Sequence, residues 1–457
     1  MLTYDFENAD GPLYQYIYKC LKDDIIKGNI KPNEKLPSKR FFAKNNGIST
    51  ITIQNAYDQL ISEGYVYTIP KKGYYASDIS GIRKLPKSQG LSLKINTREL
   101  HDDLLSLSDP KFNPDNFPFS VWARVMRDVI SNKKEVLMQT SPVGGVYSLR
   151  SAIAGHLRSF KGMLVDPNQI IVGAGTQYLY SILIKLLGTD KKYCIENPGY
   201  DRLLKIYSVN NIDCVLADMD EAGILLGSLE KSGADIAHIS PAHHFPTGIT
   251  MPAARRYEIL AWANAMSGRY IIEDDYDSEF RTNGRPIPPI FSIDVSDKVI
   301  YMNTFSKSLA STIRISYMVL PPRLANLFYE KLSFYSCTVS NFEQYTLAEF
   351  IEKGYFEKHI NRMRLYYSRK RNEILDLIQN SRFSEKCHVI ENSSGLHFLL
   401  KLDTKISDEE VTRYLKEKGM RIRALSDYYL DGDRTSRHMF ILDYSNLDIG
   451  ELKKLIS

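Results

Sequence analysis

Short apolar segments recur along the chain from about residue 101 to the end, and stretches with helical periodicity separate them. Strands that alternate with helices in this way are typical of an α/β fold with a mostly parallel sheet. Two late apolar segments, 396–400 and 439–442, indicate a smaller α+β lobe. The segments expected to form buried strands of the main sheet are 170–172, 193–195, 236–239, 270–272 and 299–302.

The chain is too long for one ordinary core. Its 457 residues exceed the roughly 100–200 of a typical domain, so we expect a small unit and a large one. No stretch approaches the roughly 20 apolar residues of a membrane span, and the acidic start does not resemble a signal peptide. Five scattered cysteines without CxxC spacing favour reduced thiols over disulfides or a metal site. A cytoplasmic protein without membrane or metal binding is expected.

Three helices and a hairpin are predicted within residues 11–78. The apolar residues of the first helix recur at every fourth position, namely Leu13, Ile17, Leu21 and Ile25. Ser38 is expected to cap a short helix that runs through Lys44, and Ser49 or Thr50 a third helix. The buried face of this third helix is expected to contain Ile53, Ala56, Tyr57 and Leu60. Segments 66–69 and 74–76 then predict two short strands.

The outer face of the third helix is short and polar at its N-terminal end, which suits entry into the major groove of DNA. Its residues are Ser49, Thr50, Thr52, Gln54 and Asn55. Basic residues that can contact phosphates flank it, namely Lys39, Arg40, Lys44, Lys71 and Lys72. A winged helix-turn-helix is therefore predicted. The polar residues alone are equally compatible with a protein-interaction module whose charges are solvated.

The sequence of this small unit resembles the GntR family of winged-helix regulators. The resemblance rests on Leu-Pro-Ser-Lys-Arg at 36–40, Ser-Thr-Ile-Thr-Ile-Gln-Asn-Ala at 49–56 and Lys-Gly-Tyr at 72–74. It implies binding of double-stranded operator DNA. The implied contact residues are Ser38, Arg40, Ser49, Thr50, Thr52, Gln54, Lys71 and Lys72. Thr50 stands where the family usually has arginine.

A basic linker is expected between the two units. Gly81, Pro86 and Gly90 interrupt any periodicity in residues 79–100, and five basic residues there face a single acid, Glu99. The expected boundaries are therefore 1–78 for the DNA-binding domain, 79–100 for the linker and 101–457 for the large domain.

Two segments of the large domain suit an anion and a reactive amine. Residues 173–177, Gly-Ala-Gly-Thr-Gln, follow a strand and open a helix, so backbone N–H groups and a hydroxyl face a phosphate. Residues 304–307, Thr-Phe-Ser-Lys, follow another strand, with Arg314 seven residues after the lysine. Such a lysine can form a Schiff base while its neighbours hold a phosphate. Alone, a glycine-rich turn or a single lysine is a weak signal.

Two further segments suit a flat aromatic ligand. Residues 273–277, Glu-Asp-Asp-Tyr-Asp, follow a strand at the end where ligands bind in open α/β sheets, and a carboxylate there can pair with a protonated pyridine. The alternative is a solvated acidic loop or a metal site. In residues 197–202, Asn-Pro-Gly-Tyr-Asp-Arg, the aromatic Tyr200 can stack on a ring and Arg202 can bind a carboxylate.

Together these segments resemble the fold-type I aminotransferases that use pyridoxal phosphate (PLP). Residues 241–248, 272–280 and 306–321 are similar to the aminotransferase-like domain of MocR-type regulators, which join it to a GntR-like head. The resemblance implies that Lys307 forms the Schiff base, Asp274 pairs with the pyridine nitrogen, Tyr276 bonds the phenolic oxygen and Tyr200 stacks on the ring. The implied phosphate ligands are Gly175, Thr176, Thr304, Ser306 and Arg314. Arg202 and Arg437, the latter chosen over Arg423, are expected to bind an effector's acid group.

The chain departs from the aminotransferase pattern at two positions. Phe245 stands where aminotransferases have an asparagine that bonds the phenolic oxygen, and Gln139 replaces a phosphate-binding tyrosine. The leading hypothesis is a homodimeric transcription regulator that binds PLP and responds to a small amine or amino acid. The alternatives are an aminotransferase with an appended DNA-binding head, and a sensor of PLP itself.

Overall fold

The computed structural model describes residues 4, 11–79, 105–108, 113–281, 287–390, 395–433, 435–445 and 447–456. Its internal contacts divide the chain into two units, Met1–His101 and Asp102–Ser457.

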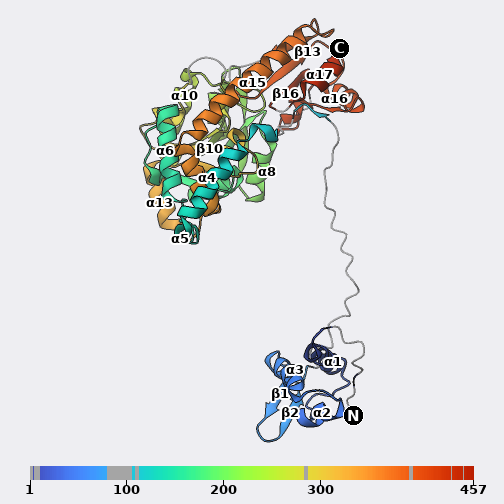
Figure 1. The fold of residues 1–457 in the computed structure, drawn as a ribbon. Coiled ribbons are helices and arrows are strands. Elements are labelled where there is room, and N and C mark those ends of the chain that lie inside the picture. The colour runs from blue at the N-terminus through green and yellow to red at the C-terminus, as the bar shows by residue number, and fades with distance from the viewer. Residues whose placement is uncertain are drawn as a thin grey trace. The chain divides into compact units, whose positions relative to one another are not determined.

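The first unit is a winged helix-turn-helix (Figure 1). Its helices are α1 (Leu13–Lys27), α2 (Lys39–Asn45) and α3 (Thr50–Ser62), and its hairpin consists of β1 (Val66–Ile69) and β2 (Gly73–Ala76). The Ser38 side chain accepts a hydrogen bond from Phe41 N at 3.3 Å, and the Ser49 side chain accepts one from Thr52 N at 3.2 Å. Both serines therefore cap the helices that follow them, as the sequence predicted at Ser38 and allowed at Ser49.

The core of this unit lies between α1, α3 and the hairpin. The residues predicted for the buried face of α3, Ile53, Ala56, Tyr57 and Leu60, are all fully buried. On α1, Ile17, Leu21 and Ile25 of the predicted helical face are buried, and Leu13 is 40% exposed. Leu13 is the first residue of α1 and extends past the end of the core. Gly28, at φ 79°, ends this helix in the left-handed conformation that glycine adopts without strain.

The second unit contains an eight-stranded mixed sheet. Its order is β4-β11-β10-β9-β8-β5-β6-β7. Strands β10, β9, β8, β5 and β6 run parallel, whereas β11 lies antiparallel between β10 and β4. The bounds are β4 (Ile170–Gly173), β5 (Tyr193–Asn197), β6 (Cys214–Asp220), β7 (Gly223–Ile224), β8 (Ile236–Ile239), β9 (Tyr270–Asp275), β10 (Val299–Thr304) and β11 (Ser316–Val319).

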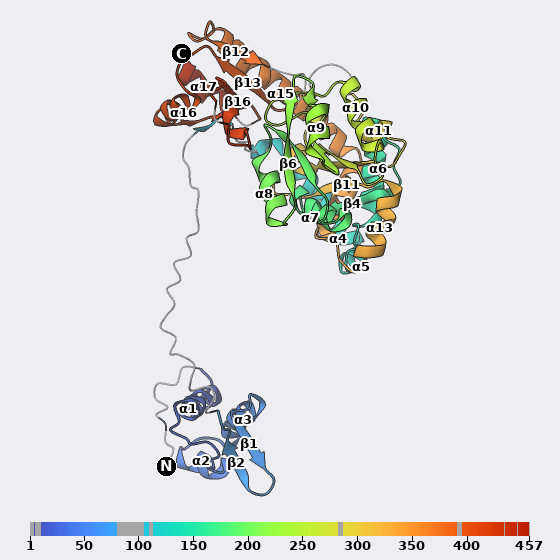
Figure 2. The ribbon, with the colours of Figure 1, turned by 180° about the vertical axis from the view of Figure 1, so that it is seen from behind.

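Helices cover both faces of this sheet (Figure 1, Figure 2). One face packs on α7 (Thr176–Leu187), α8 (Asp201–Val209) and α13 (Pro322–Leu332). The other packs on α6 (Tyr147–Lys161), α9 (Leu226–Ser232), α10 (Ala253–Asn264), α11 (Ile290–Ile293) and α14 (Asn341–Glu352). Neighbouring residues of β9 face opposite layers, since Ile271 packs with α10 and Ile272 with α7. Helices α4 (Phe119–Asn132), α5 (Lys134–Leu137) and α12 (Phe305–Ser308) complete this lobe.

A smaller α+β lobe follows the long helix α15 (Tyr355–Gln379). Its four-stranded sheet has the order β12-β13-β16-β15, with antiparallel neighbours. The remaining elements are β12 (Cys387–Ile390), β13 (His397–Leu402), α16 (Asp408–Glu417), β14 (Met420–Arg421), β15 (Arg423–Ala424), β16 (Met439–Asp443) and α17 (Ile449–Ile456), and β14 pairs with β3 (Leu105–Ser106).

The predicted fold class is confirmed for both units. Each expected strand of the main sheet is present, and β9 and β10 continue beyond their predicted ends to Asp275 and Thr304. Among the described residues, none of the helices is long and apolar enough to cross a membrane.

Candidate functional site

The acidic segment at the end of β9 places each carboxylate in its own environment. Glu273 is buried and accepts hydrogen bonds from the backbone of Ile290 and Phe291, each at 2.9 Å. Burial raises the pKa of Glu273 to about 7. Asp277 lies 2.9 Å from the Nδ1 atom of His243. The segment is therefore a set of individually bound acids, and the alternative of a solvated acidic loop does not fit it.

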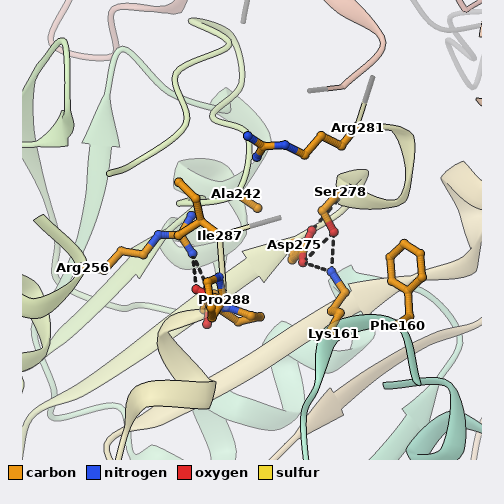
Figure 3. A pocket seen from close by; sticks show the side chains of 11 residues that line it. Phe160, Lys161, Ala242, Arg256, Asp275, Ser278, Arg281, Ile287 and Pro288 are labelled. Carbon is orange, nitrogen blue, oxygen red and sulfur yellow. Dashed lines mark hydrogen bonds and ion pairs between the residues drawn. The ribbon is translucent and has the colours of Figure 1, made fainter. Parts of the chain in front are cut away.

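Asp275 belongs to a buried ion pair on the face of the sheet that packs against α6 (Figure 3). Lys161 Nζ lies 2.5 Å from its carboxylate, and the hydroxyls of Ser278 and Tyr301 donate to it at 2.9 and 2.8 Å. Burial, the largest single influence, opposes ionisation of Asp275, but the charge of Lys161 and the hydrogen bonds from Lys161, Ser278 and Tyr301 together outweigh it and keep the pKa of Asp275 below its usual value. The ion pair lines a cavity of about 230 Å³, across which Arg256 lies.

Asp274 faces the opposite layer, towards α7. One carboxylate oxygen, Oδ2, accepts a hydrogen bond from the hydroxyl of Tyr180 and lies 3.5 Å from Nε2 of His238. Burial and the charge of Asp274 raise the pKa of Tyr180, so that its hydroxyl stays a donor. The other oxygen, Oδ1, is buried and has no hydrogen-bond partner in the described part of the chain. A buried polar atom without a partner is costly, so this oxygen is prepared for a donor that a ligand supplies.

Lys307 lies on the short helix α12, directly after β10. Its side chain is half-buried and makes no hydrogen bond or ion pair with the described residues. Burial lowers the pKa of His397 and raises the pKa of Asp443, and both residues belong to the small lobe. The charge of Lys307 makes a smaller contribution, which lowers both pKa values. The amine of Lys307 is therefore near enough to these residues of the small lobe to act on their protonation.

The hydroxyls beside Lys307 have different partners. Thr304 Oγ1 accepts hydrogen bonds from the Ser306 backbone at 3.1 Å and from the Ser316 hydroxyl at 2.8 Å. Ser306 Oγ, by contrast, is buried without a hydrogen-bond partner among the described residues. Thr304 therefore shapes the turn, and Ser306 offers the hydroxyl that remains available to a ligand.

A compact anion cradle surrounds the start of α7. Gly175 precedes the helix at φ 92°, and a Cβ atom there would lie 2.3 Å from a guanidinium nitrogen of Arg314. Only glycine allows the arginine to approach so closely. Thr176 is the first residue of α7, where backbone N–H groups have no helical acceptor. A helix N-terminus, a guanidinium group and a hydroxyl at one place suit a phosphate.

The aromatic and effector residues lie at the other strand ends. Tyr200 directly precedes α8, is 40% exposed and contacts Phe245 edge to face, with ring centroids 6.3 Å apart. The Arg202 guanidinium lies 6.0 Å from the Tyr200 ring centroid. Arg437 makes an ion pair with Asp433 at 2.7 Å and covers the ring of Tyr429. No contact in the described ranges joins Arg437 to Arg202, so their joint role stays a prediction.

Sequence reasoning missed a group of buried histidines beside Tyr276. The Tyr276 hydroxyl lies 3.4 Å from His243 Nδ1, and the rings of His243 and His397 are 4.6 Å apart. Burial lowers the pKa of neighbouring His244 to about 3. The two histidines in the segment Pro-Ala-His-His-Phe-Pro-Thr-Gly were a visible signal, but the partner His397 comes from the small lobe, 154 residues later in the chain.

The predicted DNA contacts lie on the surface of the first unit. Arg40, Thr50, Gln54, Lys71 and Lys72 are exposed. The Ser38 and Ser49 hydroxyls are engaged in helix caps, and the Thr52 hydroxyl donates to Ser49 Oγ at 3.3 Å. The predicted set therefore divides into exposed side chains that can reach a ligand and cap residues that position α2 and α3.

The residues of the second unit fit PLP. Asp274 Oδ1 lacks the donor that a protonated pyridine nitrogen supplies, and Ser306 Oγ lacks the partner that a phosphate supplies. Lys307 has an unpaired amine within the described structure, and the Gly175–Arg314 cradle suits the phosphate group. The set of groups thus includes an acidic partner, an amine and an anion site, which are the groups that PLP requires.

Two family models match the chain. Aminotransferase class I and II matches residues 104–440, and bacterial regulatory proteins of the gntR family match residues 13–75. The HTH-type transcriptional regulator YdeL of Bacillus subtilis is 36% identical over 92% of this chain and 90% of its own length. The probable rhizopine catabolism regulatory protein MocR of Rhizobium meliloti is 29% identical over 98% and 93%.

The same fold occurs in solved aminotransferases. The kynurenine aminotransferase of Pyrococcus horikoshii covers 78% of this chain and 89% of its own, with a TM-score of 0.69 and 23% sequence identity.

Proposed function

The chain belongs to the MocR-type HTH transcriptional regulators, which join a GntR-type DNA-binding domain to an aminotransferase class I and II domain, and we propose that PLP and a small amine control its binding to operator DNA. DNA is the partner that the GntR-type domain implies, and PLP is the cofactor that the aminotransferase domain implies. Binding to operator DNA supports a cytoplasmic location, which is part of the proposal.

The observation that carries the proposal is the buried, unpartnered Oδ1 of Asp274. A regulator that had lost its cofactor would gain nothing from a carboxylate held ready by Tyr180 with one oxygen unsatisfied. When bound, PLP supplies an aldehyde carbon that condenses with primary amines. Asp274 keeps a proton on the ring nitrogen, Lys307 presents its amine to that carbon, and Tyr276 holds the phenolic oxygen.

The remaining residues bind and orient. Ser306, Thr176 and the α7 N-terminus hold the phosphate beside Arg314, while Thr304 fixes the turn that carries Ser306. Tyr200 covers the ring, and Arg202 beside it binds the acid group of an amino-acid effector.

Arg437 is a second effector arginine in this proposal, and it must leave Asp433 to bind a carboxylate. An effector that takes the place of the Lys307 amine would alter the charge that acts on His397 and Asp443 of the small lobe. If the effector binds two conformations of the protein with different affinity, it shifts the equilibrium between these conformations and thereby DNA binding.

The proposal includes a homodimer of the large unit, since one recognition helix per subunit then reads a paired operator. Light scattering at micromolar protein checks this directly, and a monomer mass with PLP bound contradicts it.

The main test uses the full-length protein with PLP and follows two signals, the visible absorption of bound PLP and the anisotropy of labelled operator DNA. A panel of amines and amino acids is expected to contain one that changes both signals together in the wild type. Lys307→Ala is expected to abolish the visible band and the response to the amine, while a surface variant, Lys205→Ala, keeps both. Effects of the amine on DNA binding that persist in Lys307→Ala contradict the proposal.

Measuring keto-acid production over many equivalents of protein distinguishes the proposed regulator from the alternative of a true aminotransferase. Phe245 lacks the side-chain amide of an aminotransferase asparagine, so we expect no sustained turnover. Multiple turnover with any amino donor makes the protein an aminotransferase with an appended DNA-binding head. A response to PLP alone makes the cofactor itself the effector.

A further inference from the structure

The first turn of α3 carries an isoleucine on the face that is available to DNA. Ile51 is 72% exposed, between Thr50 and Thr52. A single exposed apolar residue is ordinary on a protein surface and by itself indicates nothing. Its position is informative, because the N-terminal turn of a recognition helix is the part that reaches the base edges.

The exposed face of α3 has no basic side chain. Its exposed residues are Thr50, Ile51, Gln54, Asn55, Asp58 and Ser62. None of residues 50–62 is lysine or arginine, and Thr50 stands where GntR-type regulators usually have arginine. Since lysine and arginine make the commonest specific contact with guanine, this helix cannot read a G·C pair in the usual way.

The hydroxyls of Ser49 and Thr52 form hydrogen bonds within the cap of α3 and are therefore not available to contact bases. Ser49 Oγ accepts hydrogen bonds from the backbone and the hydroxyl of Thr52, at 3.2 and 3.3 Å. Three of the exposed side chains lie close together near the N-terminal end of α3, namely Ile51 and the two amides that follow it, Gln54 and Asn55. Residues three and four positions apart lie on one helical face, so these three side chains form one surface.

We propose that this surface reads A·T base pairs, with Ile51 packed on the C5-methyl group of a thymine and Gln54 or Asn55 bonded to an adenine. A thymine methyl is the one apolar group that the major groove displays, and asparagine and glutamine match the N6 and N7 edge of adenine. The proposal rests on DNA binding by this unit and adds to it the class of sequence that is bound.

The test begins with duplexes selected by the full-length protein from a random pool. In the tightest duplex each thymine is replaced by uracil in turn, which deletes only the methyl group. At one thymine or more per half-site the affinity of the wild type is expected to fall about fourfold, the factor for one buried methyl. In Ile51→Ser this difference between thymine and uracil is expected to vanish, and in Ile51→Val to persist.

Ile26→Ser serves as the matched control, because Ile26 is also an exposed isoleucine (37%) but lies on α1. It is expected to keep the wild-type response to uracil. The proposal is overturned if uracil leaves wild-type affinity unchanged at every position, or if Ile51→Ser keeps the full response. Failure to select any duplex would refute DNA binding itself and is thus distinct from a wrong base preference.

Discussion

The residues expected to bind a ligand are positioned in different ways in the two units. In the first unit the capping serines bond backbone groups three residues away, and most of the side chains expected to bind DNA are exposed. In the second unit the partners are distant in sequence, since Tyr180 reaches Asp274 and Lys161 reaches Asp275. The first unit therefore presents a surface, whereas the second prepares a buried site whose unsatisfied atoms define the ligand.

The largest effect is expected from Lys161→Met, which leaves Asp275 buried without its cation. Breaking a buried ion pair from one side costs about 3–5 kcal/mol of unfolding free energy. Both tryptophans, Trp122 and Trp262, lie in the second unit, so their fluorescence during chemical denaturation reports this loss.

The matched control is Lys205→Met. Lys205 forms an ion pair with Asp201, and the two side chains are 73% and 42% exposed, respectively. A change below about 1 kcal/mol is expected there. Equal losses in both variants would remove the contrast between a buried network and a solvated surface.

Acid is expected to destabilise the second unit through buried histidine. The His156 ring stacks on Phe160, and burial, followed by the charges of Lys161 and Arg364, lowers its pKa to about 4. A lowered pKa means that the unfolded chain takes up the proton first. The stability that His156 contributes is therefore complete above about pH 6.5 and is lost as the pH falls towards 4.

His156→Phe keeps the stacking and removes the titration. Relative to this variant, the wild type should lose about 1.4 kcal/mol per pH unit between pH 6.5 and 4, in total about 3 kcal/mol. Tryptophan fluorescence during denaturation at several pH values measures it. His156 lies in the second unit, so the difference between the two proteins reports on that unit. Parallel pH profiles for the two proteins would contradict the assignment.

Asp274→Asn is expected to weaken PLP binding about 10- to 100-fold, because it replaces a charged hydrogen bond to the pyridine nitrogen. Equilibrium dialysis of PLP against the full-length protein measures the affinity. Asp190→Asn, on the surface, should bind PLP as the wild type does. Unchanged affinity in Asp274→Asn would mean that the unpartnered oxygen faces something other than the cofactor.

The same contrast explains what the sequence could predict. Caps, turns and the buried face of α3 follow from neighbours within four residues, so the cap at Ser38 and the buried face of α3 were confirmed, while α2 and β2 each extend one residue beyond their predicted bounds, to Asn45 and from Gly73. In the large unit the strand segments were correct, but the antiparallel place of β11 between β10 and β4 was not predicted. Pairing between distant strands is set by the whole sheet, and no local pattern records it.

The candidate site shows this limit in its individual residues. Asp274 and Lys307 stand in motifs that carry a recognisable chemistry, so sequence reasoning found them. Tyr180 and Lys161 occupy ordinary helical positions in α7 and α6, and only the folded sheet brings them to the acids of β9. Ile51 was overlooked because an apolar residue in a helix is normally assigned to the core.

The smallest effect is expected from Ser38→Ala in the first unit. Loss of an N-cap costs about 1 kcal/mol because the Phe41 backbone N–H loses its acceptor. In the full-length protein, amide hydrogen exchange in α2 should become about fivefold faster, whereas peptides from β9 and β10 should exchange as before. Ser62→Ala is the control, since its hydroxyl donates to a carbonyl at the exposed end of α3 and caps no N-terminus. Faster exchange in β9 after Ser38→Ala would show that the two units share their stability, and the comparison between a local and a long-range network would then no longer hold.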